Sequence, residues 1–199
     1  LKAALKFLER NQAGTMTAAD ALTAGMGLGL EGTGAGGADE QVPLVGVDAD
    51  GWLGDLLSGQ VYHRLRPMPT PAGFSGELRP YQQRGLSWLS FLGELGLGGI
   101  LADDMGLGKT IQLLSLVAGQ PEGHPTLLVC PMSLVGNWQR EAARFTPDLR
   151  VHVHHGADRL DGESLAAVLA GGADLVITTY GVATRDQAAL GQVTWARVV

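Results

Sequence analysis

The sequence has little of several residue types, and each shortage excludes a class of protein. Cys130 is the only cysteine among 199 residues, which excludes an internal disulfide and a zinc site built from several cysteines. Lysine occurs three times against eleven arginines, and the formal net charge is −6, so the composition gives no general basic surface for nucleic acid. Any contact with DNA must therefore be local.

Long apolar runs are also missing. No stretch approaches the ~20 apolar residues of a transmembrane helix, and no charged segment followed by an apolar one opens the chain as in a signal sequence. These absences favour a cytoplasmic protein. The first residue is Leu1 rather than Met, and residues 193–199 have the pattern of a strand that stops in mid-run, so we expect a fragment of a longer chain.

The chain does contain a glycine-spaced lysine–threonine pair, in residues 101–110, L-A-D-D-M-G-L-G-K-T. Gly106 and Gly108 allow the main chain to turn tightly, so that successive N–H groups point at phosphate oxygens. Lys109 is expected on the β- and γ-phosphates, and the Thr110 hydroxyl is expected to be a ligand of Mg²⁺. The pattern predicts a nucleotide site in which Lys109 and Thr110 are catalytic.

One residue departs from the strict phosphate-loop pattern G-x-x-x-x-G-K-[ST]. The pattern asks for glycine five residues before Gly108, and Asp103 stands there. Because helicase-type motors commonly relax this position, the departure narrows the family of nucleotide-driven proteins to which the chain belongs.

Strands and helices alternate along the second half of the chain. The apolar pattern predicts five strands, over residues 100–102, 126–130, 150–154, 175–178 and 194–199, and helices from Pro80, from Thr110, after Pro131 and over residues 163–169. This alternation predicts an α/β fold with a doubly wound, mostly parallel sheet. The phosphate loop would then lie at the carboxyl edge of the sheet, where ligands bind.

The first part of the chain differs in composition. It is rich in glycine over residues 25–37, so we expect a flexible linker over about residues 25–40. Pro67, Pro69 and Pro71 predict an extended connector. We place the boundary near Ala72, so that residues 1–72 form a small, partly flexible N-terminal region and residues 73–199 form the nucleotide-binding lobe.

Four segments resemble the motor motifs of the Swi/Snf family, the helicase-like DNA translocases of superfamily two. They are L-R-P-Y-Q-Q-R-G-L-S-W-L from Leu78, L-A-D-D-M-G-L-G-K-T from Leu101, L-L-V-C-P-M-S-L-V-G-N-W from Leu127 and V-I-T-T-Y-G from Val176. The resemblance covers residues 78–199 and implies the first RecA-like lobe of an ATP-driven translocase on double-stranded DNA. Residues 44–57 and 69–76 are similar to the N-terminal region associated with bacterial members.

The resemblance assigns roles to individual residues. Gln82 would read the adenine base, because a carboxamide can both donate to and accept from the base edge. On the residues alone, a solvated residue at a helix start is an equal interpretation. Asp104 has two open roles, positioning the loop or contacting magnesium. The nucleotide would be held by Gln82 and by the loop residues Asp104, Met105, Gly106, Leu107, Gly108, Lys109 and Thr110.

The resemblance also implies DNA contacts, through Ser133, Leu134, Asn137, Thr178 and Thr179. Hydroxyls, backbone N–H groups and helix N-termini bind phosphate without reading sequence, which suits a motor that steps along any DNA. Taken alone, Ser133 could equally cap the helix that follows. The implied partners are double-stranded DNA and the second RecA-like lobe of the parent chain. An Asp-Glu motif is implied directly after residue 199, so the fragment alone is expected at most to bind nucleotide weakly.

Two other functions remain open. A phosphate-loop phosphotransferase unrelated to DNA would share the loop but leaves the glutamine motif and the Thr-Thr-Tyr segment unexplained. A nucleotide-dependent interaction module would be favoured if the parent lacks the Asp-Glu pair. The histidines do not predict a metal site, because His152 and His154 alternate on a strand and no cysteine or carboxylate clearly joins them at ligand spacing.

Overall fold

The computed structural model describes residues 65–120, 123–156 and 162–199, with Thr17, Leu22, Gly51, Gly54, Asp55, Ser58 and Arg159. The predicted glycine-rich linker and most of the N-terminal region lie outside the described residues. Backbone contacts divide the chain into two compact units, one of Leu1–Arg66 with Phe91–Ile100 and one of Pro67–Ser90 with Leu101–Val199. The second unit begins slightly before the boundary predicted near Ala72, which stays a prediction.

The second unit contains a parallel sheet, whose described strands lie in the order β2-β3-β1-β4. The strands are β1 (Thr126–Cys130), β2 (Val151–His154), β3 (Leu175–Thr179) and β4 (Arg197–Val198). β1 pairs with β3 along its whole length, with Leu128 opposite Ile177, and pairs with β4 at Thr126 and Leu127. The predicted α/β fold with a parallel sheet is confirmed.

The described residues also form six helices with defined bounds. They are α4 (Pro80–Glu94), α5 (Lys109–Ala118), α6 (Met132–Phe145), α7 (Gly162–Ala170), α8 (Tyr180–Arg185) and α9 (Gln187–Leu190). α4 begins at a proline, whose fixed φ and missing N–H suit the first turn of a helix. The sequence did not predict α8 and α9, because helices of six and four residues are too short to show a helical period.

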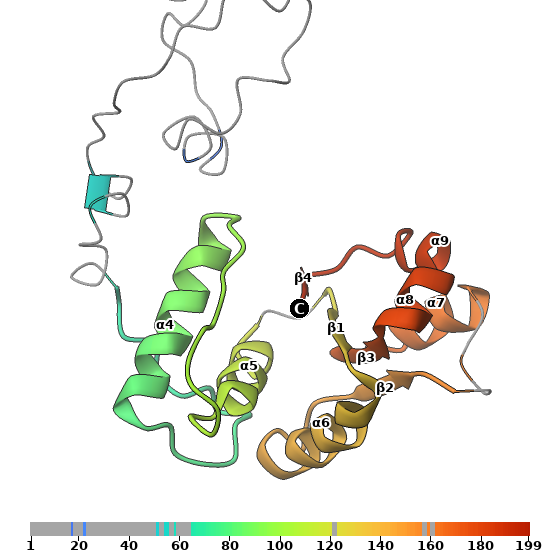
Figure 1. Ribbon diagram of the computed structural model, residues 1–199, viewed down its shortest axis with the longest axis horizontal. Coiled ribbons are helices and arrows are strands. Elements are labelled where there is room, and N and C mark those ends of the chain that lie inside the picture. Colours follow the sequence, from blue (N-terminus) through green and yellow to red (C-terminus); the bar gives the residue numbers. More distant parts are fainter. Residues whose placement is uncertain are drawn as a thin grey trace, which may run out of the picture. The chain divides into compact units, whose positions relative to one another are not determined.

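The two faces of the sheet have separate apolar cores. Successive side chains of a strand point to opposite faces, so Leu128 and Ile177 pack with Leu114 of α5 and Val135 of α6. The alternate residues, among them Val176, pack in a second cluster with Leu127, Leu165 and Leu190. Figure 1 shows α6 on one side of the strands and α7, α8 and α9 on the other. The prediction of helices on both faces is therefore confirmed.

The segment before α4 is packed against the end of α6. The rings of Phe74 and Phe145 stack, with centroids 5.7 Å apart and planes inclined by 8°. The backbone N–H of Ser75 donates to the carbonyl oxygen of Phe145 over 2.6 Å, and the N–H of Met68 donates to Ser87 Oγ over 2.8 Å. These contacts fix the entry of the chain into α4, which matters because α4 carries Gln82.

The strand predicted over residues 100–102 is wrong, because these residues have no regular secondary structure. The side chain of Ile100 is 87% exposed, which an apolar strand inside a sheet would not allow. None of the four strands of the sheet has these residues as a hydrogen-bonded neighbour. The strand predicted over residues 194–199 is present but shorter, as β4.

The amino ends of β2 and β3 are joined by a salt bridge. The guanidinium of Arg150 donates to both carboxylate oxygens of Asp174 over 3.1 Å, and the Arg150 backbone N–H donates to the same carboxylate over 2.9 Å. These hydrogen bonds hold the pKa of Asp174 below its usual value, although burial by itself raises it. The bridge stabilises the end of the sheet remote from the phosphate loop.

Candidate functional site

The phosphate loop runs into α5 through two glycines with left-handed backbones. Gly106 has φ of 87°, and Gly108, the N-cap of α5, has φ of 80° and ψ of 38°. A Cβ on Gly108 would lie 2.5 Å from Gln82 Nε2 and 3.1 Å from the side chain of Ile111. Both the backbone angle and the space around it therefore require glycine at position 108.

The side chain of Lys109 lies across its own loop. Its ammonium donates to the carbonyl oxygens of Asp103 and Asp104, the second over 2.9 Å. The first hydrogen bond of α5 runs from Gln112 N–H to Gly108 O, so the N–H groups of Lys109, Thr110 and Ile111 have no partner within the helix. A cation beside unpaired N–H groups at a helix N-terminus forms a place for an anion.

Thr110 lies in the first turn of α5 and is half-buried. In the part of the chain that the structure describes, no hydrogen bond of its hydroxyl is present. A hydroxyl next to a phosphate site is an oxygen ligand of the kind that Mg²⁺ takes. The loop, Lys109 and Thr110 together fit a nucleotide with its magnesium ion.

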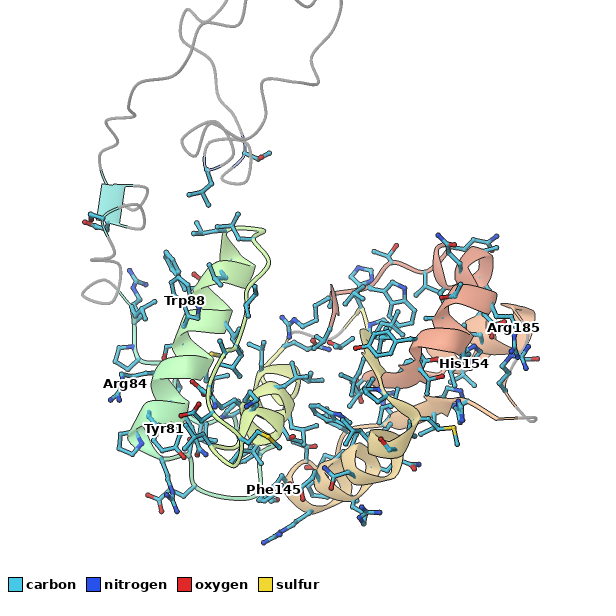
Figure 2. All side chains as sticks on the ribbon, viewed as in Figure 1. Tyr81, Arg84, Trp88, Phe145, His154 and Arg185 are labelled. Carbon is cyan, nitrogen blue, oxygen red and sulfur yellow. The ribbon has the colours of Figure 1, made fainter. Side chains whose placement is uncertain are left out.

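Gln82 ties the first turn of α4 to the phosphate loop. Its side-chain amide donates to Leu107 O over 3.1 Å and to Tyr81 Oη over 3.4 Å, and its Oε1 accepts from the Arg79 backbone N–H over 2.9 Å. Figure 2 labels Tyr81 at this end of α4. Gln82 is only 4% exposed, so the interpretation as a solvated helix-start residue is wrong. Both amide protons are used, which leaves one lone pair of Oε1 for a ligand.

The remaining loop residues differ in exposure. The side chain of Met105 is 97% exposed and that of Leu107 is 37% exposed. Asp104 is exposed, and its carbonyl oxygen accepts from Lys109 Nζ and, over 3.4 Å, from the Leu107 N–H. The backbone of Asp104 thus organises the loop, while the role of its carboxylate stays a prediction.

The residues predicted to contact DNA fall into two groups. Ser133, Leu134 and Asn137 are exposed on the first two turns of α6, which follows β1. The N-cap of α6 is Pro131, so the alternative in which Ser133 caps this helix is wrong. This group follows the carboxyl end of β1, the edge at which parallel sheets bind their ligands.

Thr178 and Thr179 form the second group, at the end of β3, and both are buried. The hydroxyl of Thr178 donates to His154 O over 2.9 Å, and Thr179 Oγ1 lies 3.4 Å from His155 Nδ1. Their side chains therefore face neighbouring protein groups. The prediction that they contact DNA stays a prediction.

His154, at the end of β2, contacts the carboxyl end of α8 (Figure 2). Its Nε2 lies 2.9 Å from Asp186 Oδ2, and Arg159 Nε donates to the same oxygen over 2.9 Å. Burial by itself raises the pKa of Asp186, but the hydrogen bonds from Arg159 and His154 hold it below its usual value. Because an ionised carboxylate only accepts, His154 Nε2 carries the proton.

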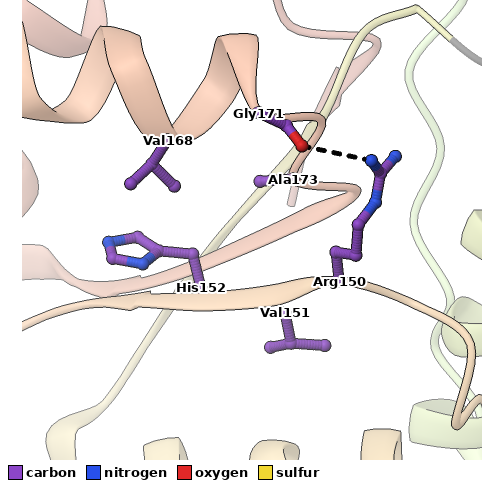
Figure 3. A pocket seen from close by; sticks show the side chains of 6 residues that line it. All are labelled: Arg150, Val151, His152, Val168, Gly171 and Ala173. Carbon is purple, nitrogen blue, oxygen red and sulfur yellow. Dashed lines mark hydrogen bonds between the residues drawn. The ribbon is translucent and has the colours of Figure 1, made fainter.

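A shallow pocket of about 200 Å³ lies away from the phosphate loop. It is lined by Arg150, Val151, His152, Val168, Gly171 and Ala173, at the amino end of β2 (Figure 3). Arg150 is held there by Gly171 O and by Asp174. Ligands of parallel sheets bind at the opposite, carboxyl edge, so we do not assign the nucleotide to this pocket.

The sequence model of a protein family, the SNF2-related domain, matches residues 81–199, which are more than half of the chain. The chain belongs to this family. Within the described ranges of this SNF2-related domain, no helix is long and apolar enough to cross a membrane. The same residues include no group of three or more His, Cys, Asp or Glu side chains that could hold a metal ion.

Several known proteins resemble this SNF2-related domain. YwqA of Bacillus subtilis, provisionally named an ATP-dependent helicase/translocase, is 45% identical over 137 residues, which are 67% of this chain and 14% of that protein. The ISWI chromatin-remodeling complex ATPase ISW2 of Saccharomyces cerevisiae is 40% identical, over 63% of this chain and 12% of its own length. The chain thus spans a small part of these relatives.

A solved structure agrees with the fold. The Sulfolobus solfataricus SWI2/SNF2 ATPase core in complex with dsDNA superposes with a TM-score of 0.57 at 37% identity, covering 67% of this chain and 27% of that one. The RecA-like character of the lobe is therefore shown, together with the Swi/Snf resemblance that the motifs predicted.

One buried residue that contacts the phosphate loop of this SNF2-related domain was not predicted. Gln112 is completely buried, and its amide donates to the Asp103 carboxylate over 3.0 Å. The sequence carried a signal for it, because Gln112 is a large polar residue between Ile111 and Leu113 in a mostly apolar stretch. Only the packed structure identifies its partner.

Proposed function

We propose that this chain is the nucleotide-binding lobe of an ATP-dependent motor that moves along double-stranded DNA, and that the full-length protein hydrolyses ATP. The observation that carries the proposal is the phosphate loop, in which two left-handed glycines bring Lys109 to the N-terminus of α5. Membership of the SNF2-related family and the names of the relatives support the same function.

Lys109 and Thr110 are the proposed catalytic residues. Phosphoryl transfer depends on positioning and charge neutralisation more than on covalent chemistry by the protein. ATP, when bound, would supply the phosphoryl group, and Thr110 is the proposed protein ligand of its Mg²⁺ ion. The ammonium of Lys109, now on two neutral carbonyl oxygens, gains in attraction when its acceptors are phosphate oxygens.

Gln82 and the loop backbone complete the proposed ATP site, with Asp104, Met105, Gly106, Leu107 and Gly108. The free lone pair of Gln82 Oε1 can accept from the amino group of adenine. Because the amide of Gln82 also holds Leu107 O, the base end and the phosphate end of the nucleotide would be sensed by one side chain. We assign the Asp104 carboxylate a positioning role in the loop.

For DNA, we propose that Ser133, Leu134 and Asn137 contact the sugar–phosphate backbone directly. They are exposed at the start of α6, where polar side chains and the helix dipole favour phosphate. Thr178 and Thr179 are proposed to shape the turn between β3 and α8 that meets the same DNA. The second lobe, with its arginines, and the Asp-Glu pair would come from the rest of the full-length protein.

The test is DNA-stimulated ATP hydrolysis by the full-length protein. Lys109→Ala should reduce turnover about a hundredfold or more, because it removes the cation that stabilises the transferring phosphoryl group. Unchanged turnover in this variant would overturn the ATP site. Turnover that DNA does not stimulate would favour a phosphotransferase unrelated to DNA. The 199-residue chain alone should give no DNA-stimulated turnover.

A paired test addresses the DNA contacts. Asn137→Ala should raise the DNA concentration that gives half-maximal stimulation, because it removes a polar side chain from the proposed phosphate contact. Gln139→Ala is the matched control, since Gln139 is also an exposed amide on α6 but is not one of the proposed DNA contacts. Equal behaviour of the two variants would remove Asn137 from the interface.

A further inference from the structure

The interior of α5 contains one large polar side chain that packing alone does not explain. Gln112 is 0% exposed, as is Leu114 beside it, and Leu116 and Val117 of the same helix are also buried in the apolar core. Transferring an amide from water to such surroundings is unfavourable unless hydrogen bonds replace those to water. A glutamine at this position therefore has to be accounted for by what its amide contacts.

The amide is only half satisfied. Gln112 Nε2 donates to Asp103 Oδ2 over 3.0 Å. Gln112 Oε1 is buried, and no hydrogen-bond partner for it lies among the described residues. A buried acceptor without a partner destabilises the folded state, so the chain keeps this side chain at a cost to its own stability.

Gly85 of α4 leaves room for the same amide, because it has no side chain. A Cβ added to Gly85 would overlap Gln112 Oε1 and would come within 3.2 Å of its Cδ. A glycine inside a helix is less stable than an alanine, because it loses more backbone freedom on folding. Two helices are thus both adapted to admit the carboxamide of Gln112.

Asp103, the partner of Gln112, also holds the phosphate-binding lysine. Its carbonyl oxygen accepts from Lys109 Nζ while its carboxylate accepts from Gln112 Nε2. Asp103 is the residue that stands where the strict phosphate-loop pattern has glycine. A glycine there would have no side chain for Gln112 to hold.

We propose that Gln112 is a positioning residue for ATP binding, which fixes the phosphate loop by holding the Asp103 carboxylate from inside the core. The inference rests on the proposed ATP site. In this role Gln112 acts through Asp103 on the loop that carries Lys109, and is not itself a proposed ligand of phosphate or metal. Gly85 is needed for this arrangement, because its missing Cβ leaves room for the amide.

The first test is Gln112→Met in the full-length protein. Methionine keeps the length and volume of the side chain and removes both the donor and the unpaired acceptor. We expect the KM for ATP to rise about tenfold, the factor that corresponds to one hydrogen bond to a charged group. The melting temperature should stay equal or rise, and kcat at saturating ATP should change less than KM.

Ser115→Ala is the matched control. Ser115 is a buried polar residue on the same helix, but its hydroxyl bonds to Ile111 O rather than to the loop. This variant should leave the KM for ATP unchanged. A melting temperature that falls in Gln112→Met with an unchanged KM would overturn the proposal, because it would assign Gln112 a structural role only.

A second test separates packing from positioning. Gly85→Ala alone should lower both the melting temperature and the affinity for ATP, because its methyl group displaces the Gln112 amide. In Gly85→Ala with Gln112→Ala, the smaller side chain makes room for the methyl group, so the melting temperature should recover while the KM for ATP stays raised. Recovery of both quantities would contradict a role for the Gln112–Asp103 hydrogen bond.

Lys109→Ala distinguishes the two levels of the argument. If it abolishes turnover while the Gln112 variants keep a normal KM, the positioning role fails and the ATP site stands. If Lys109→Ala leaves turnover intact, the ATP site itself fails.

Discussion

The side-chain amide of Gln82 donates to the backbone carbonyl of Leu107 over 3.1 Å, so the start of α4 is joined directly to the phosphate loop. The two residues are far apart in sequence and belong to different motifs. Their contact makes the geometry of the loop depend on a helix that precedes it. Four predictions about stability and nucleotide binding follow from the surroundings of individual residues.

Gln82→Glu should lower both the free energy of unfolding and the affinity for ATP. A carboxylate would face Leu107 O, and two acceptors in a site that is 4% exposed should cost about 1–3 kcal/mol of unfolding free energy. Urea denaturation measures the stability, and titration with ATP measures the site. Gln83→Glu, on the exposed neighbouring residue, should stay within about 0.5 kcal/mol. Equal losses in the two variants would refute the role of the Leu107 contact.

Asp174→Ala should remove the bridge between the amino ends of β2 and β3. We expect a loss of about 1 kcal/mol, because Arg150 is 58% exposed and solvent screens the pair. The folded state lowers the pKa of Asp174, so its stabilisation is present above the usual carboxyl pKa and is lost as the pH falls through the folded value. The difference between wild type and variant in urea denaturation should therefore shrink in acid. Asp148→Ala, at an exposed turn, is the control.

His152→Gln should reduce the sensitivity of the fold to mild acid. Burial, and to a smaller extent the neighbouring His154, lower the pKa of His152 from 6.5. The neutral ring is favoured in the folded state, so its contribution is present above pH 6.5 and is lost as the pH falls below that value. The melting temperatures measured at one pH above 6.5 and one pH below it should differ less in the variant than in the wild type. His124→Gln, on an exposed histidine, should retain the wild-type difference.

Gly172→Ala should destabilise the folded state for two reasons, a strained backbone angle and a steric clash. Gly172 has φ of 87°, and an added Cβ would overlap the Arg150 guanidinium. We expect a loss of about 1–2 kcal/mol, whereas Gly123→Ala, with φ of 133° and no neighbour within 4 Å, should show the backbone effect alone. Denaturant titration in an Arg150→Met background provides the check. A loss that persists there in full would contradict the clash with Arg150.

Much of the site could be predicted from short patterns. The spacing of Gly106, Gly108, Lys109 and Thr110 is local, and the strands and helices around it follow from the period of apolar residues. The prediction failed where local pattern and pairing disagreed. Residues 100–102 have the composition of a strand, but composition does not show whether the folded chain pairs them with another strand, and here it does not. α8 and α9 are too short to show a period at all.

The buried polar residues were the least predictable part of the site. Thr178 and Ser133 are both small hydroxyl residues at the carboxyl edge, yet one is completely buried and the other is exposed. The sequence places Thr178 in a strand and Ser133 in a helix, but the exposure of each depends on which segments cover it in the folded chain. Gln112 is the extreme case, since its partner Asp103 and its neighbour Gly85 come from separate segments.

Three features follow directly from the order and spacing of consecutive residues: the phosphate loop, the alternation of strands and helices, and the family resemblance. Three others required the folded chain: the strand order β2-β3-β1-β4, the contact of Gln82 with Leu107 and the burial of Gln112 against Asp103. These depend on contacts between residues distant in the chain, which form only when the two faces of the sheet are packed.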